Sequence, residues 1–395
     1  MIKRNVNLAK LKKGYLFPEI QMRKMKFLAE NPHADLISLG VGDTSEPIPS
    51  FIVNAMSQTA LKLGTRTGYT GYGPEEGHQD LRQHIASHIY KNEFKASEVF
   101  VSDGAGCDIG RLQMLFGPDV SVAIQDPAYP AYADGCVIQG VSEIFYMPCT
   151  PENDFFPDLE NIPKTDIIYF CSPNNPTGAV ATKDQLEKLV NFAKVNKSII
   201  VFDSAYASFI QDPQLPKSIY DIPGAKEVAI EIGSFSKMAG FTGVRLGWTV
   251  VPNELKYEDG TPVNNDWYRL ICTVFNGASN IAQQGGMAVL DQAGWLETKK
   301  LTQYYLENAQ IIKSVFEQQK REVYGGTNAP YLWVRFEHRK SWDVFQELLE
   351  KFHLVTTPGS GFGFSGEGFI RFTAFGNREK IISASERLQK CGSLC

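Results

Sequence analysis

The stretch Asp166-Ile-Ile-Tyr-Phe-Cys-Ser-Pro-Asn-Asn-Pro-Thr-Gly178 decides the fold of this chain. Its first half is an almost uninterrupted apolar run, which is typical of a strand covered on both faces of a parallel sheet. The capping-box pattern Thr182-Lys-Asp-Gln185 follows and predicts a helix to about residue 196. Further apolar runs at 198–202 and 227–232 continue the alternation. Strands that alternate with helices predict an α/β fold with a parallel sheet and right-handed crossovers.

The rest of the chain divides around this α/β segment. Apolar periodicity and turn residues predict strands at 36–40, 98–102 and 121–125, helices at 18–31, 49–63 and 106–116, and a glycine-dense loop at 68–77. A long helix is expected at about 279–320, followed by a strand–helix–strand segment to residue 373. We therefore expect three parts: an N-terminal arm that belongs to a small domain (1–48), a large domain (49–278), and a connecting helix with a smaller α+β domain (279–395).

The composition narrows the class of protein. The chain has 395 residues, of which 43% are hydrophobic and 21% charged, and its 39 basic residues face 44 acidic ones. These values exclude a disordered chain and a basic nucleic-acid binder. Seven scattered cysteines without C-x-x-C spacing predict free thiols in a reducing, cytoplasmic compartment and no zinc site. No secretory leader and no apolar run near ~18 residues is visible, so we expect no membrane segment.

Polar side chains gather where three predicted strands of the large domain end. They are Asn175, Asp203, Tyr206, Ser234, Ser236, Lys237 and Arg245. In open α/β sheets, ligands bind outside the carboxyl ends of the strands. A lysine whose pKa falls from about 10.4 towards 7–8 can form a Schiff base. Hydroxyls and an arginine can bind a phosphate, and an aspartate can keep a pyridine nitrogen protonated. Together these groups match the needs of pyridoxal phosphate.

Each of these residues also has a simpler interpretation. Asp203 alone is more often a turn residue at a strand end, and Lys237 alone is more often solvated. Arg371 alone suits an ion pair, and Tyr129 and Tyr206 alone suit packing. Only their joint order and spacing favour a cofactor site. A catalytically silent, cofactor-binding scaffold protein is the alternative from another class.

Several longer stretches carry a family resemblance. They are Gly14-Tyr-Leu-Phe-Pro-Glu-Ile20, Leu39-Gly-Val-Gly-Asp-Thr44, Gly71-Tyr-Gly-Pro-Glu-Glu-Gly77, Ser102-Asp-Gly-Ala105, Gln125-Asp-Pro-Ala-Tyr-Pro-Ala-Tyr132, Ser172-Pro-Asn-Asn-Pro-Thr-Gly178, Ser234-Phe-Ser-Lys237, Phe275-Asn-Gly-Ala-Ser-Asn280 and Pro358-Gly-Ser-Gly-Phe-Gly363. The chain resembles the fold-type I pyridoxal-phosphate aminotransferases of the aspartate aminotransferase superfamily. Among these it is similar to the LL-diaminopimelate aminotransferases over almost its whole length. The resemblance implies a mixed, mostly parallel sheet flanked by helices in a large cofactor-binding domain, beside a smaller α+β domain.

The resemblance implies how the cofactor would be held at its ring. Lys237 would bind pyridoxal 5'-phosphate covalently and, once released by substrate, would act as the base that moves the α-proton. Asp203 would pair with the pyridine nitrogen. Tyr129 would stack on the ring, and Tyr206 and Asn175 would hydrogen-bond the ring oxygen. Tyr129 and Asn175 would also contact the substrate.

The phosphate of the cofactor has its own predicted ligands. Ser234, Ser236 and Arg245 would hold it through hydroxyl and guanidinium donors. The amides of Ala105 and Gly106, at the start of a predicted helix, would add donors where anions are favoured. Each of these five residues is expected from the resemblance.

Substrate contacts are implied from two subunits. Arg371 would clamp the α-carboxylate, and Tyr15 and Gly40 would line the pocket. The family is a two-fold homodimer with shared active sites. Three residues would therefore reach the neighbouring subunit's cofactor or substrate: Tyr72, Glu75 and Asn276. Glu75 could equally be a solvated loop charge.

The implied reaction moves an amino group between small amino acids and 2-oxo acids, with glutamate aminating tetrahydrodipicolinate to LL-diaminopimelate for lysine and cell-wall precursors. One position departs from the diaminopimelate pattern, since Gly106 stands where those enzymes typically have a lysine that holds the distal end of the substrate. A related aminotransferase that acts on lysine or another amino acid, or a β-lyase, therefore stays open.

Two other patterns invite a different interpretation. Gly361-Phe-Gly-Phe-Ser-Gly366 fits the dinucleotide pattern G-x-G-x-x-G, yet it leads into a predicted strand rather than a helix. We therefore expect a close-packed loop beside Arg371. His84 and His88 share a helix face without an acidic third ligand at metal-site spacing, which predicts a surface face and no metal.

Overall fold

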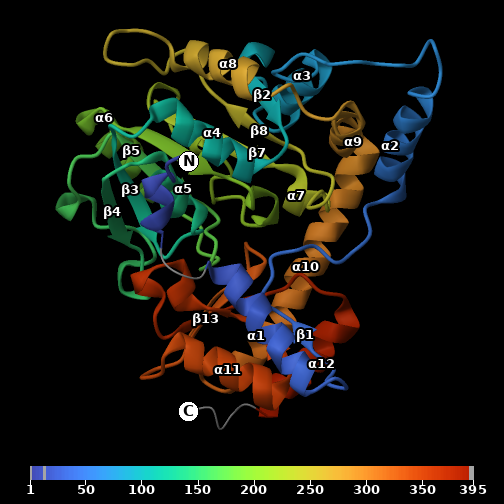
Figure 1. Cartoon of the computed structure of the whole chain (residues 1–395), viewed down its shortest axis with the longest axis vertical. Helices are drawn as coiled ribbons and strands as arrows, with labels where there is room; N and C mark the ends of the chain where they lie inside the picture. The colour runs from blue at the N-terminus through green and yellow to red at the C-terminus, as the bar shows by residue number, and fades with distance from the viewer. Residues whose placement is uncertain (1, 12–14, 391–395) are drawn as a thin grey trace.

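The computed structural model describes residues 2–11 and 15–390. Two sheets organise these residues into two bodies, which Figure 1 shows one above the other. Helix α10 (Gln292–Gln318) runs from the upper, larger body into the lower, smaller one. The domain boundaries expected from the sequence stay predictions. The strands of each sheet can be compared with the strands predicted from the sequence.

The larger body is built on a seven-stranded sheet with the order β2-β8-β7-β6-β5-β3-β4. Its strands are β2 (Val99–Ser102), β3 (Ser121–Asp126), β4 (Glu143–Pro148), β5 (Ile167–Cys171), β6 (Ile199–Asp203), β7 (Ala229–Ser234) and β8 (Gly247–Val250). Only β8 runs antiparallel to its neighbours within this sheet. The mostly parallel mixed sheet predicted from the apolar runs is confirmed.

Helices cover both faces of this sheet, which explains why its central strands are apolar throughout. One face carries α4 (Ala105–Phe116), α5 (Ala131–Gln139) and α8 (Val263–Val274), and the other carries α3 (Gln79–His88), α6 (Lys183–Asn196) and α9 (Asn280–Leu290). Helix α2 (Ser50–Lys62) packs along α9. Each face therefore has its own hydrophobic core, and the strands between them contact both.

The smaller body combines both ends of the chain. Its antiparallel sheet has the order β12-β13-β10-β9, and a two-stranded pair joins β1 to β11. These strands are β1 (Ile37–Ser38), β9 (Val323–Gly325), β10 (Tyr331–Arg335), β11 (Leu354–Val355), β12 (Thr357–Pro358) and β13 (Phe369–Thr373). Helices α1 (Leu16–Glu30), α11 (Ser341–Phe352) and α12 (Arg378–Gln389) pack around them. The N-terminal arm and the C-terminal segment thus share one core.

The single long helix expected at 279–320 is wrong at one point. The chain breaks at Asp291, whose backbone is extended (ψ 153°) and which separates α9 from α10. Gly294 explains the sharp turn, because a Cβ there would overlap the carbonyl of Ala288. A helix break that depends on a close contact between two backbone segments does not change the spacing of apolar residues, so the sequence pattern does not predict it.

No helix within residues 2–11 and 15–390 is long and apolar enough to cross a membrane. The described cysteines are free thiols, and Cys391 and Cys395 lie outside the described residues. His84 and His88 stack on one another at 5.4 Å on an exposed helix face. No cluster of metal-ligating residues occurs in the described part of the chain.

Candidate active site

A cavity of about 430 Å³ opens at the carboxyl ends of β5, β6 and β7, between the two bodies. Eleven of the residues predicted from the sequence line it: Ala105, Gly106, Tyr129, Asn175, Asp203, Tyr206, Ser234, Ser236, Lys237, Arg245 and Arg371. These residues come from positions 105 to 371, so the fold assembles them from distant parts of the chain. Strands β5, β6 and β7 are neighbours, as the argument from strand ends requires.

Lys237 lies in α7 (Phe235–Met238), the short helix that follows β7 directly. Its amine donates a hydrogen bond to the carbonyl of Gly42, which belongs to the N-terminal arm. Burial is the main cause that lowers the pKa of Lys237 to about 8. Asp43 opposes this shift, and the nearby Arg371 and Arg245 contribute to it. A neutral, nucleophilic amine is therefore accessible close to neutral pH.

Asp203 ends β6 and is buried at the base of the cavity. Its Oδ2 accepts a hydrogen bond from the hydroxyl of Tyr132 at 2.7 Å, and its Oδ1 accepts one from the amide of Ala205 at 3.0 Å. Burial raises the pKa of Asp203, while these two donors lower it. Both partners are neutral, so a cationic group bound in the cavity would stabilise the charge of this buried carboxylate.

Tyr132 is a site residue that the sequence argument did not single out. It is the second residue of α5, is fully buried, and stacks on Tyr169 with ring centroids 5.3 Å apart. Its ring also meets Tyr129 edge-on at 5.9 Å. It thereby connects the carboxylate of Asp203 with the tyrosine predicted to stack on the cofactor. The family stretch 125–132 contains Tyr132. Its hydrogen-bond partner Asp203 lies 71 residues further along the chain, so the sequence did not predict their contact.

Two tyrosine hydroxyls meet on the wall of the cavity. The hydroxyl of Tyr206 lies 2.8 Å from that of Tyr331, which belongs to β10 of the smaller body. Tyr331 was missed because nothing in a strand pattern shows which side chain crosses to another domain. Asn175 lies nearby, where its Oδ1 accepts a hydrogen bond from Arg371 at 2.6 Å. Contacts of Tyr206 and Asn175 with a ring oxygen stay predictions.

The predicted phosphate ligands surround one end of the cavity. Helix α4 begins at Ala105, so the amides of Ala105 and Gly106 have no acceptor within the helix. Ser234 caps α7 by accepting a hydrogen bond from the amide of Ser236 at 3.0 Å. Gly104 (φ 122°) makes room for Arg245, because a Cβ there would lie 2.6 Å from the guanidinium. Amides, hydroxyls and a guanidinium together suit a dianion.

Arg371 is a fully buried cation on β13. Besides Asn175, it donates to the carbonyl of Gly40, and its guanidinium lies 4.5 Å from the ring of Tyr331. Its Nε is buried without a hydrogen-bond partner among the described residues, and none of its hydrogen-bond acceptors there is a carboxylate. Burial lowers the pKa of Arg371. A buried guanidinium in this state is suited to an anionic ligand.

Two predicted pocket residues lie beside the cavity rather than on its wall. Tyr15 packs near Tyr129, and burial together with this neighbour raises the pKa of the Tyr15 hydroxyl. The carbonyl of Gly40 accepts hydrogen bonds from Arg371 and, at 2.7 Å, from Thr357. Gly40 therefore contacts Arg371, the arginine predicted to bind the substrate, directly. The contacts of Tyr15 and Gly40 with a substrate stay predictions.

Three predicted residues lie away from this cavity: Tyr72, Glu75 and Asn276. Tyr72 is 89% exposed on the glycine-dense loop, and Asn276 is exposed as well. Their segments lie together, since a Cβ on Gly277 would come within 3.0 Å of the carbonyl of Pro74. Within this chain they form no part of the site, so their role across a dimer stays a prediction.

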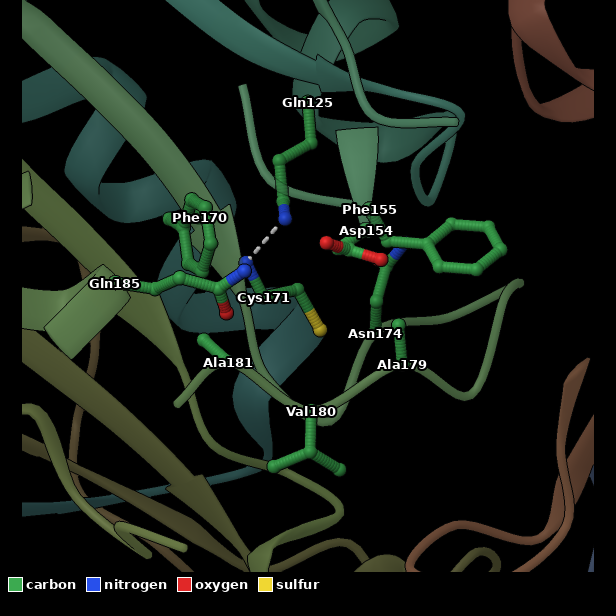
Figure 2. A pocket seen from close by; sticks show the side chains of 10 residues that line it. All are labelled: Gln125, Asp154, Phe155, Phe170, Cys171, Asn174, Ala179, Val180, Ala181 and Gln185. Atoms are coloured by element: carbon green, nitrogen blue, oxygen red, sulfur yellow. Dashed lines mark hydrogen bonds between the residues drawn. The ribbon is translucent and has the colours of Figure 1, made fainter. Parts of the chain in front are cut away.

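A smaller cavity of about 10 Å³ has Asn174 among its lining residues, and Figure 2 shows the side chains of these residues. Here the amide of Cys171 donates to Oε1 of Gln125 at 2.6 Å. Cys171 lines both this cavity and the larger one. The smaller cavity has room for a single water molecule and none for a substrate. The chemistry therefore belongs to the larger cavity.

Comparison with known proteins identifies the class. The profile of the family "Aminotransferase class I and II" matches residues 34–388, and the chain belongs to this family. Aminotransferases of this class depend on pyridoxal phosphate. The fold-type I architecture and the cofactor predicted from the sequence are thus confirmed.

The branch of the aminotransferase family follows from relatives that share more than half of their residues with this chain. The chain is 55% identical to the LL-diaminopimelate aminotransferase of Protochlamydia amoebophila, over 98% of this chain and 97% of the relative. It is also 55% identical to the chloroplastic LL-diaminopimelate aminotransferase of Arabidopsis thaliana, over 98% and 87% of the two chains. The structure of L,L-diaminopimelate aminotransferase from Chlamydomonas reinhardtii matches with a TM-score of 0.96 and 54% identity, over 99% and 98%. The predicted resemblance to this branch is confirmed.

The residues of the cavity fit pyridoxal phosphate. The buried carboxylate of Asp203 has only neutral donors, and a protonated pyridine nitrogen supplies the missing cation. The helix start, the two serines and Arg245 offer donors for a phosphate at the other end. Lys237 provides an amine of lowered pKa in the same cavity.

Proposed function

We propose that this aminotransferase exchanges an amino group between LL-diaminopimelate and 2-oxoglutarate. In the biosynthetic direction, glutamate would aminate tetrahydrodipicolinate towards lysine and cell-wall precursors. The observation that carries the substrate assignment is the 55% identity, over 98% of the chain, to proteins named LL-diaminopimelate aminotransferase. The buried, unpaired Nε of Arg371 supports an α-amino acid as the substrate, since both amino donors carry an α-carboxylate.

Each step of the reaction is assigned to residues of this chain. Arg371 binds the α-carboxylate through paired N–H donors and so orients the α-carbon towards Lys237. The amine of Lys237, whose pKa is lowered to about 8, would act as the base that accepts the α-proton and holds it for transfer. When bound, pyridoxal phosphate supplies an electron sink for the charge that develops at the α-carbon. Asp203 would hold the pyridine nitrogen of the cofactor in its protonated form, and Tyr206 would donate a hydrogen bond to the ring oxygen.

We further propose a homodimer with shared active sites in a reducing, cytoplasmic compartment. Tyr72, Glu75 and Asn276 would then complete the partner's pocket. The exposure of Tyr72 and the contact between its loop and residue 277 support this assignment. Free thiols among the described cysteines support the compartment.

A panel of amino donors tests the substrate. Holoenzyme is mixed with LL-diaminopimelate, meso-diaminopimelate, lysine, aspartate, alanine or glutamate, and the half-reaction is followed by the absorbance of the cofactor. We expect LL-diaminopimelate and glutamate to give the highest kcat/KM values. Lysine turning over faster than diaminopimelate would establish the alternative, a related aminotransferase acting on lysine.

Gly106 sharpens this test. A Cβ at Gly106 would meet no atom within 4 Å, so a longer side chain has room there. Gly106→Lys is expected to lower the KM for LL-diaminopimelate and to leave that for alanine unchanged, because alanine has no distal carboxylate. An unchanged KM for diaminopimelate would show that another group holds the distal end.

A further inference from the structure

The loop 359–366 contains the G-x-G-x-x-G pattern of residues 361–366. This loop has no role in the reaction described above. It consists of two short 3-10 turns, Gly359–Phe362 and Phe364–Gly366, and leads into β13, the strand that carries Arg371. The expected close-packed loop beside Arg371 is confirmed. We call residues 359–366 the bridging loop, because it contacts the larger body at the end of β3.

Three hydrogen bonds join the bridging loop to the larger body. The amide and the hydroxyl of Ser365 both donate to Oδ2 of Asp126, at 3.0 and 2.9 Å. The amide of Ala128 donates to the carbonyl of Phe362 at 2.9 Å. Asp126 is the last residue of β3 and is buried. The bonded segment runs directly into Tyr129, which lines the active-site cavity.

The same loop touches the substrate-binding arginine from the other side. The ring of Phe362 lies 4.8 Å from the guanidinium of Arg371, and Trp333 meets this ring edge-on at 6.2 Å. Leu16, the first residue of α1, packs against Gly361 so closely that a Cβ there would overlap it. The loop therefore contacts the N-terminal arm, the end of β3 and Arg371 at once.

Glycine at position 363 is required by both conformation and space. Its φ of 142° lies in the region that side chains rarely adopt, and a Cβ would overlap the carboxylate of Asp126. Gly260 offers a comparison, because its φ of 85° is also positive but a Cβ there would meet no atom within 4 Å. Unlike Gly260, Gly363 combines the backbone requirement with a contact that leads to the site.

We propose that the bridging loop is a positioning element of the active site. It fixes Arg371 on the smaller body relative to Tyr129 on the larger one, and so sets where the substrate carboxylate lies with respect to the cofactor ring. Gly363, Ser365 and Asp126 are its positioning residues, and none of them needs to touch substrate. This inference rests on the proposed roles of Arg371 and Tyr129.

Gly363→Ala tests the proposal, with Gly260→Ala as the matched control for a strained alanine. We expect Gly363→Ala to raise the KM of the preferred amino donor about tenfold or more, with the cofactor absorbance retained and kcat changed less than about threefold. Gly260→Ala should leave KM unchanged. An unchanged KM in Gly363→Ala overturns the proposal, as does a rise that comes only with loss of the cofactor.

A milder variant covers the case in which Gly363→Ala does not fold. Ser365→Ala removes one of the two donors to Asp126, and Ser365→Thr keeps the hydroxyl. We expect KM to rise about threefold in the first and to return to the wild-type value in the second. Equal KM values in both variants and the wild type overturn the proposal.

Arg371→Lys separates this proposal from the one on which it rests. It keeps the charge but loses the paired donors. A large rise of KM in Arg371→Lys together with an unchanged KM in Gly363→Ala would refute the bridging loop alone. An unchanged KM in Arg371→Lys would refute the proposed carboxylate site, whatever the loop variants do.

Discussion

Two regions of the molecule bury charge, and they do so in opposite ways. At the cavity, Lys237 and Arg371 have backbone carbonyls and an amide oxygen as partners, and the Nε of Arg371 has none among the described residues. Away from the cavity, Glu231 of β7 is buried with four donors around it. They are the hydroxyls of Ser218 (2.5 Å), Tyr90 (2.9 Å) and Ser204 (3.0 Å) and the amide of Ile219 (3.0 Å).

Asp108 in α4 is, like Glu231, a buried carboxylate that the protein surrounds with hydrogen-bond donors. Its carboxylate accepts hydrogen bonds from the hydroxyls of Ser102 at 2.5 Å and Thr249 at 2.8 Å, and from Arg111 at 3.1 Å. Burial raises the pKa of Asp108 to about 6 and that of Glu231 to about 7. A shifted pKa therefore marks both regions equally. What distinguishes the active site is a cavity beside buried charges whose partners the protein does not supply.

Removal of Lys237 should have the largest effect on activity. Lys237→Ala takes away both the covalent anchor and the base, and we expect the half-reaction with glutamate to fall by at least about 10²–10⁴-fold. Reduction with borohydride should fix a pyridoxyl group on wild-type protein, at Lys237, and none on the variant. Mass spectrometry of the peptide that contains residue 237 measures this directly.

Lys188→Ala is the matched control, because Lys188 is an exposed lysine on α6, remote from the cavity. It should behave as wild type in both assays. Labelling of the Lys237→Ala protein at another lysine, with turnover preserved, would refute the assignment of the cofactor amine.

Loss of the hydrogen bond from Tyr132 should have an intermediate effect. Tyr132→Phe removes the donor that favours the ionised form of Asp203, so the pKa of Asp203 should rise further. The carboxylate then becomes protonated at a higher pH, and the acid limb of the kcat/KM profile should move upwards. We expect a roughly tenfold lower kcat, which corresponds to about 1.4 kcal/mol.

Tyr169→Phe provides the control for a lost buried hydroxyl. Tyr169 stacks on Tyr132 but lies outside the cavity, so its variant should lose stability without any shift of the pH profile. Parallel pH profiles for wild type and Tyr132→Phe would mean that this hydrogen bond does not tune Asp203.

The sequence predicted those parts of the site that follow from strand ends. Asn175, Asp203 and Lys237 come directly after buried apolar runs, and parallel neighbours bring such positions together. Tyr132 and Tyr331 were missed for a common reason. Each reaches its partner through a contact that spans 71 or 125 residues, and no local pattern encodes it. The break at Asp291 was missed similarly, because it depends on one close backbone contact.

The smallest effect on activity is expected from Glu231, although the same variant should change stability clearly. Because burial raises the pKa of Glu231 from 4.5 to about 7, the folded state binds an additional proton between these two values. By linkage, the contribution of Glu231 to stability is then highest below about pH 4.5 and falls as pH rises towards 7. Above pH 7 the loss is complete and this contribution is constant.

Glu231→Gln removes this titration and leaves the cavity untouched. The glutamine N–H groups face donors such as the amide of Ile219, so we expect the variant to be less stable by about 1–3 kcal/mol at pH 5.5. The difference from wild type should shrink between pH 5.5 and 8, because only the wild-type protein loses the contribution of a bound proton. Urea unfolding at several pH values measures it, with kcat/KM expected within about twofold of wild type. A constant difference across this pH range would show that Glu231 stays ionised in the folded protein. A large loss of kcat/KM would show that Glu231, like Lys237 and Asp203, contributes to the reaction.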